Sequence, residues 1–197
     1  IIENLDLEKR VSITPDVVKK YVSLNLNVCI EKNYGNHLGI TDEEYKFSGA
    51  NILPTKEEVI NKSDIVVQVN FPENNSLNFF KKDHCLIGTF GSHLANGNIN
   101  KMVKMGVNIF SLDLLPRITR AQSMDVLSSQ ANLAGYRSVI ESIHEFKKAI
   151  PMMMTAAGTI PAAKVFVIGA GVAGLQAIAT AKRLGAIVSA TDVRSVA

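Results

Sequence analysis

Three glycines in the C-terminal part of the chain have the spacing of a phosphate-binding turn. Gly169, Gly171 and Gly174 follow the apolar, β-branched run 165–168 and open an Ala-rich run of helical character. In such a turn the first glycine permits a sharp bend, the second lets the backbone approach a pyrophosphate, and the third lets the helix lie close on the strand. The first N–H groups of the helix carry partial positive charge. The pattern therefore predicts a site for a ligand that contains a pyrophosphate.

An acidic residue, Asp192, ends a second apolar run, 187–191, at roughly twenty residues beyond the glycines. A carboxylate there accepts hydrogen bonds from an adenosine ribose and repels a 2′-phosphate. We therefore expect NAD rather than NADP at this site, although Arg194 is a signal in the opposite direction. The predicted cofactor-binding residues are Gly169, Ala170, Gly171, Val172, Ala173, Gly174, Asp192 and Arg194.

The elements that must hold this turn are a strand over 165–168, a helix from Val172 to about Leu184, and a second strand over 187–191. The run 165–181 has no charge and approaches the length of a membrane span, but its three glycines and Gln176 argue against direct membrane insertion. Two strands and one helix rarely bury enough surface to fold alone. We therefore interpret this second domain as truncated.

Upstream of this unit, helices alternate with short apolar strands, which is typical of a parallel sheet covered on both faces. The expected fold is α/β, with two Rossmann-like doubly wound parallel-sheet domains, a cleft between them, and the second domain incomplete. We place the first domain at 1–117 and the second at 118–197. The expected strands of the first domain are 27–31, 50–53, 64–69, 85–89 and 107–112, and its expected helices begin at Pro15, after the Thr-x-x-Glu capping boxes of Thr41 and Thr55, and near Leu77 and Ile99.

Between the domains, the polar segment 116–125 is predicted to be a loop that leads into a long helix from about Asp125 to Lys148. An apolar stripe at helical spacing in that helix is interpreted as core. The methionines 152–154 follow it. Because methionine adapts to irregular gaps, we expect them to fill space between the domains, with a soft partner surface as the alternative.

The composition excludes several classes of protein. The 197 residues carry a net charge of only +3, and their lysines are scattered, so nucleic acid is not an expected partner. No cluster with metal-ligand spacing is visible. Cys29 and Cys85 have no CxxC spacing and are expected to be buried free thiols, which favours a reducing compartment. No targeting signal is visible.

Several segments together resemble a known family. They are 117–125 (RITRAQSMD), 127–132 (LSSQAN), 135–137 (GYR), 154–158 (MTAAG) and 169–177 (GAGVAGLQA), with a looser match over 8–11 (EKRV). The chain closely resembles domain I, the NAD(H)-binding domain, of proton-translocating NAD(P) transhydrogenases. The resemblance implies a signature loop with Arg117, Gln122, Asp125 and Ser128 as its functional residues.

In that family the arginine and the aspartate hold the nicotinamide and its carboxamide, the serine assists them, and the glutamine reaches toward NADP(H) bound by a different domain. The resemblance thus implies direct hydride transfer between NAD(H) bound here and NADP(H) on a partner domain, coupled to proton movement across a membrane. Such a reaction needs two rings held in orientation rather than a general base. It also implies NADP(H)-binding and transmembrane partner domains, a homodimer, and a soluble location beside an energy-coupling membrane of a bacterium, a mitochondrion or another organelle.

Two alternatives stay open. Alanine dehydrogenase shares the architecture and the region around Arg10. The resemblance to that family implies a substrate site with a lysine on the strand after Asp64 and a histidine in a His-Leu-Ala stretch. His93 is present here, but the strand, 65–70, has no lysine, and we assign His93 no catalytic role. The other alternative is a non-catalytic NAD-binding module.

Overall fold

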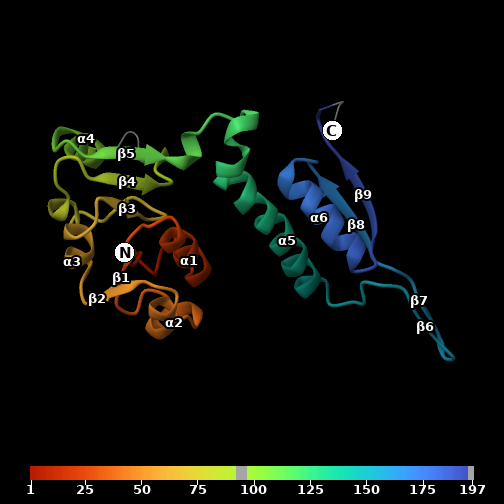
Figure 1. The fold of residues 1–197 in the computed structure, drawn as a ribbon. Coiled ribbons are helices and arrows are strands. Elements are labelled where there is room, and N and C mark those ends of the chain that lie inside the picture. Colours follow the sequence, from red (N-terminus) through yellow and green to blue (C-terminus); the bar gives the residue numbers. More distant parts are fainter. Residues whose placement is uncertain (92–96, 195–197) are drawn as a thin grey trace. The chain divides into compact units, whose positions relative to one another are not determined.

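The computed structural model describes residues 1–91 and 97–194. The chain divides into two compact units, Ile1–Met124 and Asp125–Ala197 (Figure 1). The sequence placed a boundary seven residues earlier, between 117 and 118; the position of the domain boundary stays a prediction.

The first half of unit 1 contains a two-stranded parallel sheet of β1 (Cys29–Glu31) and β2 (Asn51–Leu53). Helices α1 (Pro15–Ser23) and α2 (Asp42–Phe47) belong to the same half. The predicted capping box of α2 is confirmed, because Thr41 and Glu44 exchange both hydrogen bonds. Thr14 is the N-cap of α1 without a side-chain bond. The buried residues that hold this half together are Val18, Val28, Ile30, Tyr34, Tyr45 and Ala50.

The second half of unit 1 contains a parallel sheet in the order β3 (Ile65–Val67), β4 (Cys85–Gly88) and β5 (Asn108–Ser111). Helices α3 (Lys56–Asn61) and α4 (Gly97–Lys104) alternate with these strands, and the helix predicted near Leu77 is only a short 3-10 turn, η2 (Leu77–Phe79). The core is built by Ile1, Val59, Ile60, Val66, Leu77, Phe80, Leu86, Phe90, Met102 and Val107. Cys29 and Cys85 are free as predicted, but they are half-buried rather than buried.

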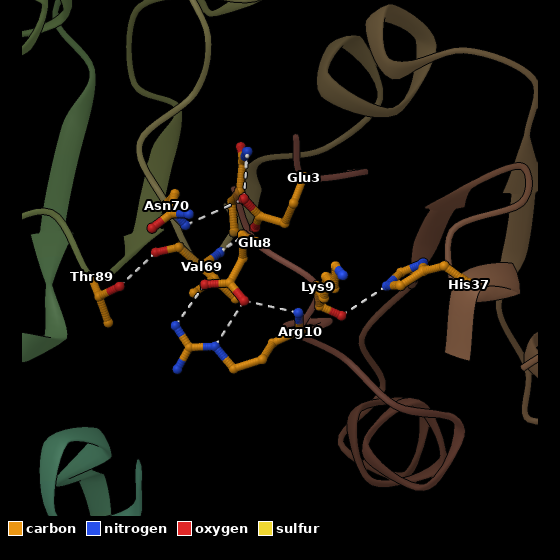
Figure 2. A network of polar contacts seen from close by, with 9 residues as sticks. Glu3, Glu8, Lys9, Arg10, His37, Val69, Asn70 and Thr89 are labelled. Atoms are coloured by element: carbon orange, nitrogen blue, oxygen red, sulfur yellow. Dashed lines mark hydrogen bonds and ion pairs between the residues drawn. The ribbon is translucent and has the colours of Figure 1, made fainter. Parts of the chain in front are cut away.

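The N-terminal segment is fastened to the end of β3 by a buried carboxylate (Figure 2). Glu3, which is 6% exposed, accepts hydrogen bonds from the backbone N–H of Val69 at 2.6 Å and of Asn70 at 3.4 Å. Gln68 donates its side-chain amide to the same carboxylate at 3.3 Å. Burial raises the pKa of Glu3, because the charged form loses its hydration. This cluster fixes the backbone at the carboxyl end of β3.

Unit 1 ends in two 3-10 segments, η4 (Leu112–Leu114) and η5 (Thr119–Met124). The prediction of a loop over 116–125 was therefore wrong for 119–124. Ala121 explains the compact form, because it is 6% exposed and its N–H donates to the carbonyl of Ile118 at 2.9 Å. A polar segment can thus be anchored by one small apolar residue.

Unit 2 consists of the long helix α5 (Val126–Phe146), a hairpin and a βαβ unit. The βαβ unit comprises β8 (Lys164–Ile168), α6 (Val172–Arg183) and β9 (Ile187–Thr191), and β8 pairs with β9 in parallel, from Lys164 opposite Ile187 to Ile168 opposite Thr191. These elements lie within one residue of their predicted bounds. Val139 on α5 packs with Ala177 and Ala181 on α6 to form the small core of the unit.

An antiparallel hairpin, β6 (Met153–Thr155) and β7 (Gly158–Ile160), lies between α5 and β8 and was not predicted. Every residue of both strands is exposed. Met154 is 72% exposed, and Met152 just before the hairpin is 61% exposed. Within unit 2, the three methionines therefore stand on an open surface.

Candidate dinucleotide site

The turn after β8 requires glycine at its first position. Gly169 has φ of +98°, a left-handed conformation that side chains rarely adopt. Its N–H donates to the carbonyl of Thr191 at 2.7 Å, so the turn starts against the end of β9. The sharp bend expected from the sequence is present, and it carries the chain directly into α6.

The other two glycines of the turn serve different purposes. A Cβ on Gly174 would lie 1.7 Å from the carbonyl oxygen of Gly169, so only glycine lets α6 begin this close to the turn. A Cβ on Gly171 would meet nothing within 4 Å. Gly171 is the N-cap of α6 and has no side chain to cap it. The first N–H groups of an α-helix have no partner within the helix, and such groups are donors that can bind a phosphate.

Asp192 is joined to this turn by its side chain. The N–H of Ala170 donates to Oδ2 of Asp192 at 2.6 Å, which ties the turn to the residue that follows β9. Arg194 donates its backbone N–H and its Nε to Oδ1, at 2.8 and 2.9 Å, and its Nη2 to Oδ2 at 3.0 Å. The Asp192 side chain is 9% exposed. The Arg194 guanidinium, with these N–H groups, holds the pKa of Asp192 well below its usual range, so the carboxyl stays ionised.

The start of α5 brings together two of the predicted site residues. Asp125 is the N-cap of α5, and its Oδ1 accepts the N–H of Ser128 at 2.9 Å. The hydroxyl of Ser128 donates to Oδ2 at 2.7 Å. Both oxygens of the carboxylate are thus oriented by the first turn of the helix.

Helices α5 and α6 pack closely against each other at Gly135. A Cβ on Gly135 would lie 2.1 Å from the carbonyl oxygen of Ala173, in the first turn of α6. Gly135 was assigned no role of its own from the sequence. A signal was available, because glycine inside a helix costs about 1 kcal/mol relative to alanine and usually has a packing reason. Gly135 lets α5 pack directly against the start of α6, next to the glycine turn.

Arg117 and Gln122 lie in unit 1, whereas Asp125 and Ser128 begin unit 2. Arg117 precedes η5 and Gln122 lies within it, and both side chains are exposed. Exposure leaves a guanidinium and a carboxamide accessible to a ligand or a partner domain. Their roles stay predictions.

The end of β3 bears on the comparison with alanine dehydrogenase. The strand is followed by Gln68 and Asn70, and within the described residues the buried Oε1 of Gln68 has no hydrogen-bond partner. The guanidinium of Arg10 donates to the carboxylate of Glu8, with Nη2 at 2.6 Å and Nε at 2.9 Å (Figure 2). His93 lies outside the described residues.

Residues 1–91 and 97–194 contain neither a metal-binding cluster nor a membrane-spanning helix. Among these residues, no three His, Cys, Asp or Glu side chains gather as a metal ion would require. No helix in this portion of the chain combines the length and the apolar character needed to cross a membrane.

Both parts of the chain match models of known protein families. Residues 1–134 match the family described as alanine dehydrogenase/PNT, N-terminal domain, and residues 138–197 match its C-terminal domain. The chain belongs to the alanine dehydrogenase/PNT family. Membership implies NAD(H) binding. The family match also confirms the predicted α/β fold with a C-terminal domain that is only partly present.

Within the alanine dehydrogenase/PNT family, the chain is similar to transhydrogenases. It is 47% identical over 193 residues to an NAD(P) transhydrogenase alpha subunit chain of Rhodospirillum rubrum, and the match covers 95% of this chain and 50% of the relative. A crystal structure of the transhydrogenase from Sinorhizobium meliloti is 47% identical, with a TM-score of 0.91 over 100% of this chain and 58% of that chain. The name of the first relative describes a component of a larger enzyme.

Its similarity to alanine dehydrogenase is lower. A solved L-alanine dehydrogenase is 25% identical, with a TM-score of 0.79 over 98% of this chain and 54% of that chain. The chain spans about half the length of the curated relatives it matches. The family and the resemblance to transhydrogenase sequences predicted from the signature segments are confirmed.

Proposed function

We propose that this chain is part of the NAD(H)-binding component of a proton-translocating NAD(P) transhydrogenase. The observation that carries the proposal is the closed set of contacts at the turn, where Gly169 bends the chain, Gly174 seats α6, and Asp192 holds the N–H of Ala170. These features suit a dinucleotide, because they place N–H donors for a pyrophosphate beside a carboxylate for a ribose. The 47% identity to a transhydrogenase subunit supports the choice of reaction.

In this proposal each group of residues has a separate task. The turn and the first N–H groups of α6 bind the pyrophosphate, and Asp192 accepts hydrogen bonds from the adenosine ribose. Asp125, oriented by Ser128, and Arg117 hold the nicotinamide and its carboxamide. When NADH is bound, its C4 carbon supplies the hydride, which passes with both bonding electrons to the nicotinamide of NADP⁺ and leaves NAD⁺.

Gln122 aligns the NADP(H) side of the reaction. No proton leaves either ring in a direct hydride transfer, so the residues need to orient and exclude water rather than act as a general base. We further propose an NADP(H)-binding partner domain, a transmembrane partner domain, a homodimer, and attachment beside an energy-coupling membrane.

The test is single-turnover hydride transfer from NADH to an NADP⁺ analogue, measured with the full-length protein reconstituted with its NADP(H)-binding domain. Isotopic label at C4 of NADH should appear in the reduced analogue without exchange with water. Loss of label to water, or efficient NAD-linked oxidation of alanine by the same preparation, would defeat the proposal. The alanine assay is informative because the end of β3 presents Gln68 and Asn70 and no lysine.

A further inference from the structure

Arg194 donates three hydrogen bonds to the predicted ribose-binding acid, Asp192, and the proposed function gives it no task. Its side chain is 57% exposed, while that of Asp192 is 9% exposed. A carboxylate offers about four lone-pair directions to donors. Four N–H donors reach Asp192 here: the backbone N–H groups of Ala170 and Arg194, and Nε and Nη2 of Arg194. Nothing is left for the two hydroxyls of a ribose unless a donor leaves.

We propose that the Arg194 guanidinium is a latch on the ribose subsite, which competes with the ribose hydroxyls for the carboxylate of Asp192 and, once displaced, lies beside the ribose 2′ position. This inference rests on the proposed NAD(H) site. It assigns Arg194 a role in setting both affinity and the choice between NAD(H) and NADP(H).

The guanidinium is the donor that can leave. The N–H of Ala170 is part of the turn between β8 and α6, and the N–H of Arg194 belongs to the main chain two residues after Asp192. Moving either would move the backbone. The guanidinium needs only side-chain rotation, and it is more than half exposed, so water can solvate it after displacement. The guanidinium end of the pair is exposed to water, which screens the attraction and makes its exchange for two ribose hydroxyls feasible.

The same acid-x-arginine geometry occurs in unit 1, which shows what is special about Asp192. In Glu8-Lys9-Arg10, the arginine also donates its backbone N–H, Nε and Nη2 to the carboxylate two residues before it. The local geometry is therefore a property of the spacing and does not by itself mark a ligand site. Asp192 differs because its carboxylate also binds the N–H of Ala170 in the glycine turn. A latch at Asp192 thus sits on the ligand site.

The latch affects selectivity through charge. A lone carboxylate repels a 2′-phosphate, but a carboxylate paired with arginine presents little net charge. The planar fork of arginine fits phosphate oxygens well, so a displaced guanidinium close to the 2′ position would attract the phosphate of NADP(H). Arg194 therefore weakens NAD(H) binding by competition and reduces the rejection of NADP(H). The ion pair is not a pH switch in the neutral range, because the pKa of Asp192 is far below it.

The experiment is calorimetric binding of NADH and of NADPH to the full-length protein and its Arg194→Ala variant. Removal of the competing guanidinium, which is more than half exposed, should tighten NADH binding on the order of threefold, while NADPH binding weakens, and the gain should shrink as salt screens the pair. The matched control is Arg183→Ala, which removes the same charge from an exposed position at the end of α6. Loss of a positive charge alone weakens the binding of an anion, so the control should bind NADH equally or more weakly.

Unchanged or weaker NADH binding by Arg194→Ala, measured against Arg183→Ala, would overturn the latch and leave the proposed function standing. Failure of the wild-type protein to bind NADH would overturn both. Where Arg194→Ala does not fold, Arg194→Lys replaces it. Lysine keeps the charge but lacks the fork, so NADH binding should tighten by a smaller factor, and no gain would contradict the inference.

Discussion

The two units contain the same kinds of element but differ in how those elements are buried. In unit 1, Leu86 of β4 is fully buried, and it belongs to a hydrophobic core to which all three strands of the sheet or their neighbouring helices contribute. In unit 2, the hydrophobic core cluster has only Val139, Ala177 and Ala181 as buried members among the described residues, and Phe166 and Ile168 of β8 are 62% and 82% exposed. The predicted pyrophosphate and ribose contacts lie on this thinly buried unit. We infer that unit 1 is stabilised by its own side chains, whereas unit 2 gains more from what binds it.

The largest expected difference is in hydrogen exchange. In the 197-residue chain, amides of β4 should exchange on the order of a thousandfold more slowly than amides of β8, because local opening of a thinly buried sheet costs far less than global unfolding. Mass spectrometry of peptic fragments measures both. Saturating NADH should slow exchange in β8 and β9 and leave β4 unchanged. Equal protection of the two strands without NADH would break the comparison.

The second difference separates transfer from binding. Gln122→Asn shortens the side chain by one methylene, about 1.5 Å, and keeps the amide. Hydride transfer in a single turnover should slow about a hundredfold, because the reaction depends on alignment. NADH affinity should hardly change, since the turn and Asp192 are in unit 2.

Gln130→Asn is the matched control for this experiment, because it makes the same change at an exposed position on α5. A transfer rate of Gln122→Asn within about twofold of wild type would contradict the role of Gln122.

The third difference concerns cofactor choice. The full-length protein should bind NADH at least about tenfold more tightly than NADPH, because Asp192 accepts hydrogen bonds from the ribose and disfavours a 2′-phosphate. Asp192→Asn should remove most of this preference. Glu8→Gln is its counterpart in unit 1, where the same acid-x-arginine pair should affect neither affinity. Equal affinities of the wild type for both nucleotides, measured by calorimetry, would sink the assignment of Asp192.

The smallest expected effect is a pH dependence in unit 1. The pKa of Glu3 is raised from its ordinary 4.5 by burial, so the folded state binds the proton more tightly than the unfolded state does. Its contribution to the free energy of unfolding is present below about pH 4.5 and is lost as the pH rises through the folded pKa. Glu3→Gln should therefore gain stability relative to wild type as the pH rises from about 4.5 through the folded pKa of Glu3, measured by urea unfolding. A constant difference across that range would show that Glu3 does not titrate as described.

Local patterns predicted the βαβ unit well, because its determinants are adjacent in sequence. The apolar run 165–168 and Gly185 after α6 place its ends with little help from the rest of the chain. The hairpin β6–β7 was missed, since its strands are only three residues long and exposed. The sequence did contain a signal, because Gly158 follows two small residues. In the structure Gly158 has a φ of +140°.

The contacts of the site were harder to predict than its elements. Arg194 was interpreted from sequence as a signal for a phosphate, but in the structure it binds the carboxylate of Asp192. Gly135 touches Ala173 across a separation that no local pattern encodes. The functional roles of Arg117, Gln122, Asp125 and Ser128 come from the resemblance, because polar side chains in a short segment are compatible with many tasks.

The exposed hairpin also makes the chain sensitive to oxidation at methionine. Met152 and Met154 are 61% and 72% exposed, whereas Met102 is fully buried in the core of unit 1. Peroxide adds one oxygen to an accessible thioether and converts an apolar side chain into a polar sulfoxide. Met102 thus supplies an internal reference for the methionines near the hairpin. Any assembly that covers this surface will be visible as a slower mass increase in the peptide that contains them.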